Sequence, residues 1–411
     1  MQGRERGGVP TDDELSRFRN EVAQWLDKQC PLSMRQPLLP GESLPAGGRR
    51  MPGVSDDARA WLEAMGSRGF IKPHWRIEHG GAGLDSARVD VLAQELARVG
   101  ARPPLAELNT GIKMLAPILL SHGTVEQQQR FLPLIARGSV RWCQGYSEPE
   151  AGSDLAALRT RAVLEDDCYV VTGHKIWSSY AHMSDWIFCL VRTSNEDKHG
   201  GISFLLIDLE SPGITVEPIT LLSGSSVFCE VHFSDVRVPR DQLVGQPGAG
   251  WPIAKELLSH ERAMLGSAGG GLSGGGGGRS MSLAKLVGKA MEEQDTGARG
   301  ALAERFGQHL AELAALKATT VRLRQENRRD AFMPSLIKLV STELNMKRED
   351  FISELLGLDA LGWDGDVAVP SVGRAQGWLR SRANSIEGGT SEIQLNIIAR
   401  HGLKLPQGAA Q

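Results

Sequence analysis

The sequence predicts an α+β protein built from an N-terminal helical domain, a middle antiparallel β-domain and a C-terminal helical bundle. Three observations support this order. Apolar residues recur at helical spacing up to about residue 137, short strand-like runs fill about 140–245, and helical spacing returns beyond Trp251. Because the strands do not alternate with helices, we expect a mostly antiparallel sheet. We therefore place the domains at 1–137, 138–246 and 247–411.

The N-terminal domain opens with a clear helix signal. Thr11 precedes Glu14 by three residues, which is the spacing of a capping box, and apolar residues continue from Leu15 along one helical face. The glycine cluster at 80–83 follows no strand and lacks the spacing of a dinucleotide-binding loop, so it predicts a turn between helices. Further helices are expected at 56–68, 86–99, 108–122 and 125–136.

Strand signals dominate the middle domain. Runs rich in β-branched and aromatic residues predict strands at 186–191, 202–207 and 231–233. Residues 168–172 and 175–179 are expected to pair as a hairpin across a turn at Gly173–His174. Trp177 lies on the second arm of this hairpin, where it would either pack into the core or offer a surface on which a planar ligand stacks.

Helical spacing continues from Trp251 nearly to the C-terminus, with one interruption. The run from Gly266 to Gly278 ends in five consecutive glycines, and each glycine inside a helix costs about 1 kcal/mol relative to alanine. We therefore expect a break or loop at 269–278, which is either a tolerated insertion or a gating element.

The composition argues against several classes of function. The 46 basic and 49 acidic residues give a net charge of -3, which favours neither non-specific nucleic-acid binding nor an anionic membrane as partner. No apolar run approaches the roughly 18 residues of a membrane span, and the N-terminus lacks the apolar core of a signal peptide. The five cysteines include no C-x-x-C pair, so we expect free thiols, no metal site and a cytoplasmic protein.

Several segments together resemble the acyl-CoA dehydrogenase family. The resemblance covers most of the chain in the family's order, and the stretch from Trp142 to Arg262 is most similar to large-subunit, pimeloyl-CoA-type members, which occur in pairs. It implies the family fold, with the sheet as a small domain between two helical ones. The segments that carry it are YSEPEAGSD (146–154), GHKIWSS (173–179), DWIFCLVRT (185–193), GISFLLIDLESPGITVEPI (201–219), FSDVRVPRDQLVG (233–245) and RANSIEGGTSEIQLNIIARHGL (382–403).

The resemblance implies α,β-dehydrogenation of an acyl-CoA thioester with FAD as cofactor. This reaction needs a base for the α-proton, an acceptor for the β-hydride and donors for the thioester oxygen. Side chains cannot accept hydride, whereas the N5 atom of a flavin can. Ser153 matches a residue that contacts CoA. The residues whose motif positions imply FAD contacts are Gln144, Tyr146, Ser147, Trp177, Ser179, Thr390 and Glu392.

The position of the catalytic base distinguishes branches of the family. In medium- and short-chain members a glutamate stands where this sequence has Gly388, and Glu387 lies one residue too early. Long-chain and isovaleryl types place the base on the first long helix of the C-terminal domain, which implies Glu261 in this chain. A desolvated carboxylate beside an acyl pocket would have a raised pKa. Arg262 is expected to orient Glu261, to bind CoA phosphate or to form a surface salt bridge, and the Gly388 N–H to bind the thioester oxygen.

Two departures from the family pattern concern the adenine side of FAD. Residues 305–307 keep only part of an R-x-x-F-G segment, and 355–363 replace part of a glycine-rich one. We therefore consider three hypotheses. The first is a dehydrogenase that acts on a bulky or branched acyl-CoA and reduces an electron-transfer flavoprotein. The second is a non-catalytic or site-sharing subunit of a heteromeric dehydrogenase, and the third is a flavin acyl-CoA oxidase or monooxygenase of the same fold. The chain is expected to form homo- or hetero-oligomers.

Overall fold

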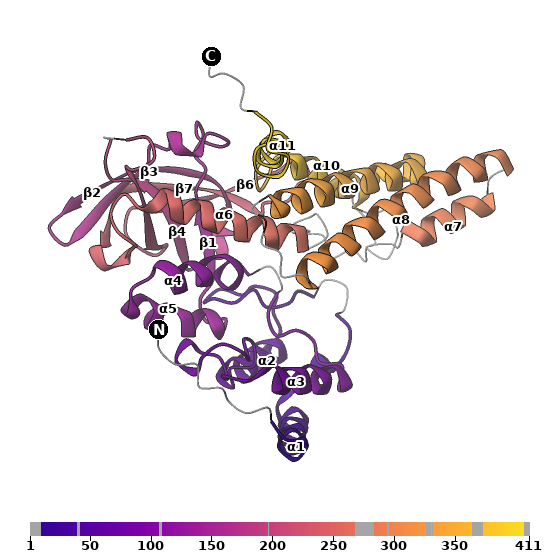
Figure 1. Ribbon diagram of the computed structural model, residues 1–411, viewed down its shortest axis with the longest axis horizontal. Coiled ribbons are helices and arrows are strands. Elements are labelled where there is room, and N and C mark those ends of the chain that lie inside the picture. The colour runs from indigo at the N-terminus through magenta and orange to yellow at the C-terminus, as the bar shows by residue number, and fades with distance from the viewer. Residues whose placement is uncertain are drawn as a thin grey trace. The chain divides into compact units, whose positions relative to one another are not determined.

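A computed structural model provides the structure of the chain (Figure 1). The chain divides into two compact units: Met1–Cys143 with Met183–Ile187 and Asp208–Glu210 form the first, and the remaining segments form the second. The glycine-rich break expected at 269–278 lies outside the described residues. The structure describes residues 10–38, 42–106, 109–195, 197–267, 283–293, 296–325, 330, 332–363 and 373–406.

Helices make up most of the first unit. Thr11 caps α1 with its side chain, and Glu14 completes the predicted capping box. Trp61 lies fully buried in the core of this unit and donates from Nε1 to the Arg102 carbonyl at 3.0 Å. The helix predicted at 108–122 is in part a π-helical turn, Gly111–Leu115. The α-helices are α1 (Asp12–Gln29), α2 (Asp56–Ser67), α3 (Ser86–Arg98), α4 (Ala116–His122) and α5 (Val125–Ala136).

The middle of the chain forms one eight-stranded sheet, with strand order β6-β7-β3-β2-β4-β5-β8 and β1 paired to β4. The pairs β2–β3, β3–β7, β6–β7 and β5–β8 are antiparallel, and β2–β4 is parallel. The expectation of a mostly antiparallel sheet is confirmed for these pairs. The strands are β1 (Trp142–Gly145), β2 (Arg161–Glu165), β3 (Cys168–Ser179), β4 (Trp186–Arg192), β5 (Ile202–Asp208), β6 (Ile214–Ile219), β7 (Phe228–Pro239) and β8 (Leu243–Val244).

The hairpin predicted across Gly173–His174 is wrong. β3 runs unbroken from Cys168 to Ser179, and the antiparallel partner of its first half is β2. Gly173 occupies the strand because Thr160 packs against it: a Cβ added at Gly173 would lie 2.6 Å from the Thr160 Cα. The glycine therefore marks a close approach of two backbones rather than a turn.

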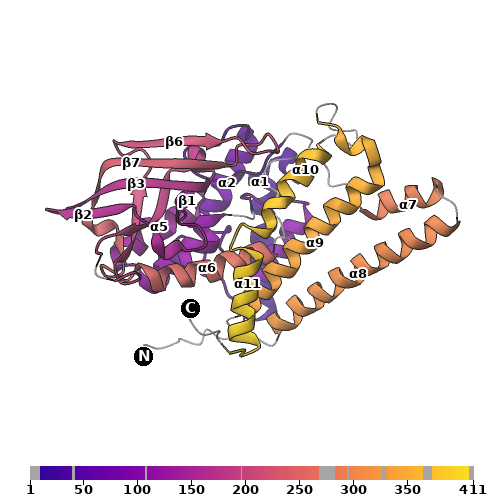
Figure 2. The same cartoon turned by 90° about the horizontal axis from the view of Figure 1, so that it is seen from above.

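Helices of the C-terminal half gather around α9, which contacts α6, α7, α8, α10 and α11. Figure 2 shows α7, α8 and α9 lying alongside one another. Phe351 and Ile352 of α9 are buried in a cluster with Leu283 and Val287 of α7. The helices are α6 (Gly250–Ser267), α7 (Leu283–Glu293), α8 (Thr296–Gln325), α9 (Met333–Leu356), α10 (Arg374–Ser381) and α11 (Ser391–Ile397).

The predicted order of helices, sheet and helices is confirmed. Most of the sheet nevertheless belongs to the same compact unit as the C-terminal helices, so boundaries at 138 and 247 remain a prediction. All five cysteines are free thiols. In the described part of the chain, no helix combines the length and apolar character needed to cross a membrane.

The close approach at Gly173 yields a stability prediction. Gly173→Ala should lower the free energy of unfolding by about 1–3 kcal/mol, because the added methyl group overlaps the Thr160 backbone. Gly152→Ala is the matched control, since no described atom lies within 4 Å of its added Cβ. Urea denaturation of both variants measures the difference, and equal midpoints would refute the packing argument.

Candidate active site

A buried ion pair ties the segment after β1 to β3. The Lys175 ammonium, fully buried, lies 2.7 Å from Glu148 Oε1 and donates to the Tyr146 carbonyl at 3.1 Å. Next to it, the Ile176 N–H donates to the Ser147 carbonyl at 2.9 Å. These bonds hold residues 146–148 beside the part of β3 that carries Trp177.

Glu148 is the centre of this attachment. Its carboxylate also accepts from the backbone N–H groups of Arg159, at 2.6 Å, and Thr160, at 2.9 Å. Burial alone would raise the pKa of Glu148, but the charge and hydrogen bonds of Lys175, with those backbone donors, hold the pKa below its usual value. Glu148 is therefore ionised at neutral pH and stabilises the turn in which it lies.

Trp177 is an exposed aromatic side chain on a strained backbone. Its φ is +63°, in the left-handed region, and it lies where the β3–β7 register shifts between Lys175 and Ser178. The side chain is 51% exposed and meets Phe228 edge-on at 5.9 Å between ring centroids. This exposure excludes the core-packing interpretation of Trp177. A strained position that presents a flat ring is typical of a ligand-binding surface.

Gln144 and Glu261 bring β1 and α6 together. The Gln144 Nε2 donates to Glu261 Oε2 at 3.2 Å. Glu261 is half-buried, and the residues a turn and two turns before it, Leu257 and Ile253, are buried in the apolar face of α6. The predicted base and a predicted flavin-bordering residue are therefore in direct contact.

Tyr146 lies beside this pair. Its ring is buried and packs edge-on against Phe188 and Phe204. Burial raises the pKa of Tyr146 well above its usual value, and the charge of Glu261 raises it further. Among the described residues its hydroxyl has no hydrogen-bond partner. A buried, protonated hydroxyl without a partner is a donor available to a bound molecule.

The loop that carries Gly388 is held from beneath by a second buried lysine. Lys338 of α9 donates to the carbonyls of Asn384, at 3.1 Å, and Gly389, at 2.8 Å. Burial lowers the pKa of Lys338, and nearby carboxylates that include Glu261 oppose the shift. Gln394 also donates to the loop carbonyls. Gly388 has a φ of +64°, a conformation that glycine adopts without strain.

Both carboxylate oxygens of Glu387, the alternative base, accept hydrogen bonds from neighbouring side chains. Arg380 donates to its Oε2 at 2.7 Å and Asn384 to its Oε1 at 2.6 Å. The Arg380 guanidinium also lies over the Phe228 ring at 5.4 Å. Glu387 therefore fixes the start of the loop and links it, through Arg380 and Phe228, to the strand pair that carries Trp177.

The other predicted residues differ in how closely they join this group. Ser179 lies on β3 directly opposite Phe228, and the Thr390 side chain caps α11 by accepting from the Ile393 N–H. Glu392 and Ser153 are exposed. Position 262 belongs to α6, but the Arg262 side chain lies outside the described residues.

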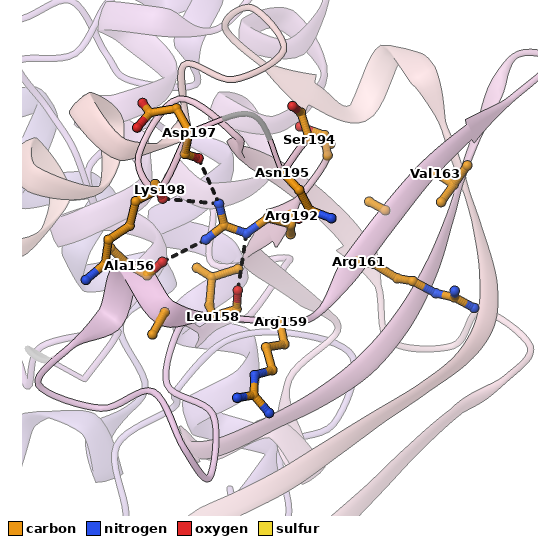
Figure 3. A pocket seen from close by; sticks show the side chains of 13 residues that line it. Ala156, Leu158, Arg159, Arg161, Val163, Arg192, Ser194, Asn195, Asp197 and Lys198 are labelled. Atoms are coloured by element: carbon orange, nitrogen blue, oxygen red, sulfur yellow. Dashed lines mark hydrogen bonds between the residues drawn. The ribbon is translucent and has the colours of Figure 1, made fainter.

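A separate hollow of about 630 Å³ lies beside β2 and contains none of the predicted flavin-contacting or base residues. It is lined by residues from 156–163 and 192–198. Figure 3 shows the Arg192 guanidinium bonded to backbone carbonyls, with Arg159 and Arg161 directed away from that network. Arg159 pairs with Glu150 and Lys198 with Asp154. Arg161 has no side-chain partner within the described residues, so the hollow has a free cation at its edge.

The sequence did not reveal Lys175, Lys338 or Arg380 as parts of this site. One signal was available for Lys338: it lies three or four residues along α9 from Ser335, Ser341 and Thr342, all of them buried. A lysine within a buried face requires buried acceptors. Lys175 and Arg380 carry no such signal, because their partners come from distant segments.

Comparison with known proteins identifies the family. Models of the N-terminal, middle and C-terminal domains of acyl-CoA dehydrogenases match residues 46–139, 143–236 and 248–403. The chain belongs to the acyl-CoA dehydrogenase family. It is an oxidoreductase of the acyl-CoA dehydrogenase type, in a family of flavoproteins of lipid metabolism that typically bind FAD.

Several acyl-CoA dehydrogenases match nearly the whole chain. Acyl-CoA dehydrogenase IpdE1 of Mycobacterium tuberculosis is 33% identical over 419 residues, covering 96% of this chain and 99% of the relative. The solved Tcur3481-Tcur3483 steroid ACAD has 26% identity and a TM-score of 0.69, covering 98% of this chain and 100% of that one. The ChsE4-ChsE5 complex from Mycobacterium tuberculosis has 28% identity and a TM-score of 0.66, with coverage of 98% and 100%.

The Lys175–Glu148 pair provides a test of how the site is held. Glu148→Gln should lower the free energy of unfolding by about 3–5 kcal/mol, because Lys175 is left buried without a counter-charge. Adding Lys175→Met should restore part of the loss. Lys198→Met is the control, since its partner Asp154 is exposed and such pairs contribute at most about 1 kcal/mol. If the losses of unfolding free energy in the two single variants simply added in the double variant, Glu148 and Lys175 would not be energetically coupled.

The same pair sets a direction for pH dependence. The pKa of Glu148 is lower in the folded chain than in the unfolded one. Ionised Glu148 therefore makes its full contribution to the free energy of unfolding at any pH above its pKa in the unfolded chain. As the pH falls through the pKa of Glu148 in the folded chain, this contribution is lost. The difference in unfolding free energy between the natural chain and Glu148→Gln should therefore shrink on acidification.

Proposed function

We propose that this chain catalyses FAD-dependent α,β-dehydrogenation of an acyl-CoA thioester, with Glu261 as the base that removes the α-proton. The contact between Glu261 and Gln144 carries this proposal, because it puts a half-buried carboxylate beside the segment expected to border the flavin. A partly desolvated carboxylate is better matched to a weak carbon acid than one in water.

The residues present fit a flavin. Trp177 offers an exposed ring, and the orphaned Tyr146 hydroxyl offers a buried donor. Bound FAD supplies the hydride acceptor that no side chain can provide. The residues that would hold it are Gln144, Tyr146, Ser147, Trp177, Ser179, Thr390 and Glu392.

Proton removal is coupled to stabilisation of the thioester oxygen. As the α-proton moves to Glu261, negative charge grows on that oxygen, and we assign the Gly388 N–H as its donor. Lys338 and Gln394 hold the carbonyls of this loop, so the donor is positioned before substrate arrives.

Glu387 is the weaker candidate for the base. Its two carboxylate oxygens accept from Arg380 and Asn384, and its side chain is only 13% exposed. Glu387 is better suited to positioning the loop than to accepting a proton from carbon.

The charged part of CoA fits the hollow beside β2. Ser153 precedes the lining residues by three positions, and Arg161 brings a cation without a described partner. A phosphate group pairs readily with an arginine through charge-assisted hydrogen bonds. We therefore assign Arg161 to CoA phosphate, together with Ser153 and, in its predicted role, Arg262.

Substrate and partners follow from the relatives. The similarity to a steroid ACAD supports a bulky acyl group, and the similarity to a two-component complex supports assembly with a related chain that shares the flavin site. Leu358, Leu361 and Trp363 are exposed and provide apolar surface for such a partner. We assign an electron-transfer flavoprotein as acceptor, rather than oxygen, and a cytoplasmic location.

The base assignment is testable by anaerobic reduction. Glu261→Gln should keep its flavin but lose bleaching by acyl-CoA, with a rate about 10²–10⁴-fold lower, the usual contribution of a general base. Stopped-flow absorbance of the flavin band measures this. Glu387→Gln, the matched control, should still be reduced, and the opposite pattern would transfer the role to Glu387.

Flavin content must be measured first. A chain purified without flavin that gains it on mixing with a related chain would show a shared site, and the reduction experiment then uses the mixed complex. Oxygen consumption during turnover would identify an oxidase instead of a dehydrogenase.

The role of Arg161 predicts a selective loss of affinity. Arg161→Ala should raise the KM for acyl-CoA about 10- to 100-fold, which corresponds to the roughly 1.5–3 kcal/mol of a hydrogen bond to a charged group. The KM for an acyl-pantetheine thioester, which lacks the phosphates, should not change. Arg237→Ala, on β7 and outside the hollow, is the control. A rise in both KM values would place Arg161 outside the phosphate site.

A further inference from the structure

Two imidazoles and a carboxylate lie together on one face of the β3–β7 pair. His174 of β3 and His232 of β7 are direct cross-strand partners, and Glu230 lies two residues before His232 on the same face. Lys175 and Val231, also cross-strand partners, are fully buried on the opposite face. Figure 2 shows β6, β7 and β3 as neighbouring strands. The cluster is therefore on the more exposed side of the sheet.

The donor atoms of this cluster are close enough to share one ion. One ligand atom from each of the three residues lies within 4.8 Å of the others. The His174 Nε2 is 2.7 Å and the His232 Nε2 is 3.6 Å from Glu230 Oε2. Ligands at about 2.0–2.2 Å from a zinc ion are separated by roughly 3–3.6 Å. Small side-chain movements therefore suffice to place an ion between them.

The contact between His174 and Glu230 is not a hydrogen bond. Although the two atoms are 2.7 Å apart, the Nε2 of His174 is a buried atom with no hydrogen-bond partner in the described part of the chain. The His174 and His232 rings stack at 4.0 Å with an interplanar angle of 21°. Both Nε2 atoms lie within 3.6 Å of the same Glu230 oxygen, so the two ring nitrogens converge on one region.

We propose that His174, Glu230 and His232 form a binding site for a divalent transition metal of the zinc class. Two imidazole nitrogens and one carboxylate oxygen are ligands that zinc accepts, and three protein ligands leave a position for water or another group. Magnesium and calcium prefer oxygen-only surroundings, so the two histidines select against them.

The site is separate from the proposed dehydrogenation. None of the three residues is assigned to the flavin, the base or CoA. A bound metal would cross-link β3 to β7 three residues before Trp177, at the point where the strained bulge begins. The site therefore binds a cation and fixes the strand that presents Trp177.

The sequence predicts no metal site, because the three residues show no contiguous metal-binding motif. His174 and His232 are 58 positions apart, and only the antiparallel register brings them opposite each other. Glu217 of β6 lies directly across from Glu230 and adds negative charge on this face.

Zinc titration of the flavin-containing protein, with any purification tag removed, tests the site. Calorimetry should show one zinc bound per chain, and His174→Ala and His232→Ala should each weaken binding at least about tenfold, since even loss of an outer-shell partner costs about 10–100-fold. His401→Ala, an exposed histidine far along the sequence, should bind zinc like the natural chain. Magnesium should give no binding.

Three further readouts and one further variant make the outcome decisive. Flavin content and circular dichroism show whether each variant is folded, and Glu230→Gln keeps the shape of the third ligand while removing its charge. Anomalous scattering at the zinc edge from a zinc-soaked crystal should place the ion among the three residues. Absence of zinc binding by the natural chain, or histidine variants that bind zinc as tightly as the natural chain, would overturn the proposal.

Discussion

Lys175 buries its ammonium group completely in the sheet, where it contacts the Glu148 carboxylate and donates to the Tyr146 carbonyl. Desolvating the two ions is unfavourable by several kcal/mol, so the pair is tolerated only with all its hydrogen bonds in place. Glu148 satisfies this condition through the backbone donors at 159 and 160. The turn after β1 is consequently locked to β3, and Tyr146 and Trp177 are held at fixed positions.

Lys338 holds the C-terminal loop at 384–389 in a similar way. Its ammonium binds two carbonyls of 384–389, and the left-handed conformations of Gly388 and Gly389 let the loop close over it. Glu261 lies between the two systems, bonded to Gln144 and within the electrostatic reach of Tyr146 and Lys338. Two buried lysines on separate elements thus organise the surroundings of one carboxylate, which is the preorganisation that the proposed proton transfer from carbon requires.

The sequence predicted correctly those features that depend on residues close together in the chain. The capping box at Thr11, the helix at 125–136 and the change from helical to strand periodicity all depend on neighbours within a few residues, and the structure has them. Motif positions also predicted site roles for Gln144, Tyr146, Trp177 and Glu261. In the structure Gln144 donates to Glu261, and the charge of Glu261 reaches Tyr146. Trp177 lies on β3, next to Ile176, which is bonded to Ser147. Ser153 and Glu392 are exposed, and their assigned contacts remain predictions.

Features that depend on long-range pairing were missed. Gly173 suggested a turn because its tight contact is with Thr160, which lies in a different segment, just before β2. The burial of Lys175 and the pairing of Glu387 with Arg380 require tertiary neighbours that no window of sequence contains. The stacking of His174 on His232 depends on strand register, which side-chain burial and not motif spacing determines.

The most direct measurement is a structure with FAD and a non-reactive acyl-CoA thioester bound. The account predicts the Glu261 carboxylate at roughly 3–3.5 Å from the substrate α-carbon, the distance of a near-attack geometry, with the flavin ring against Trp177. The account would be contradicted by Glu261 turned into bulk water, by side chains packed against the exposed face of Trp177, or by Glu387 at the α-carbon.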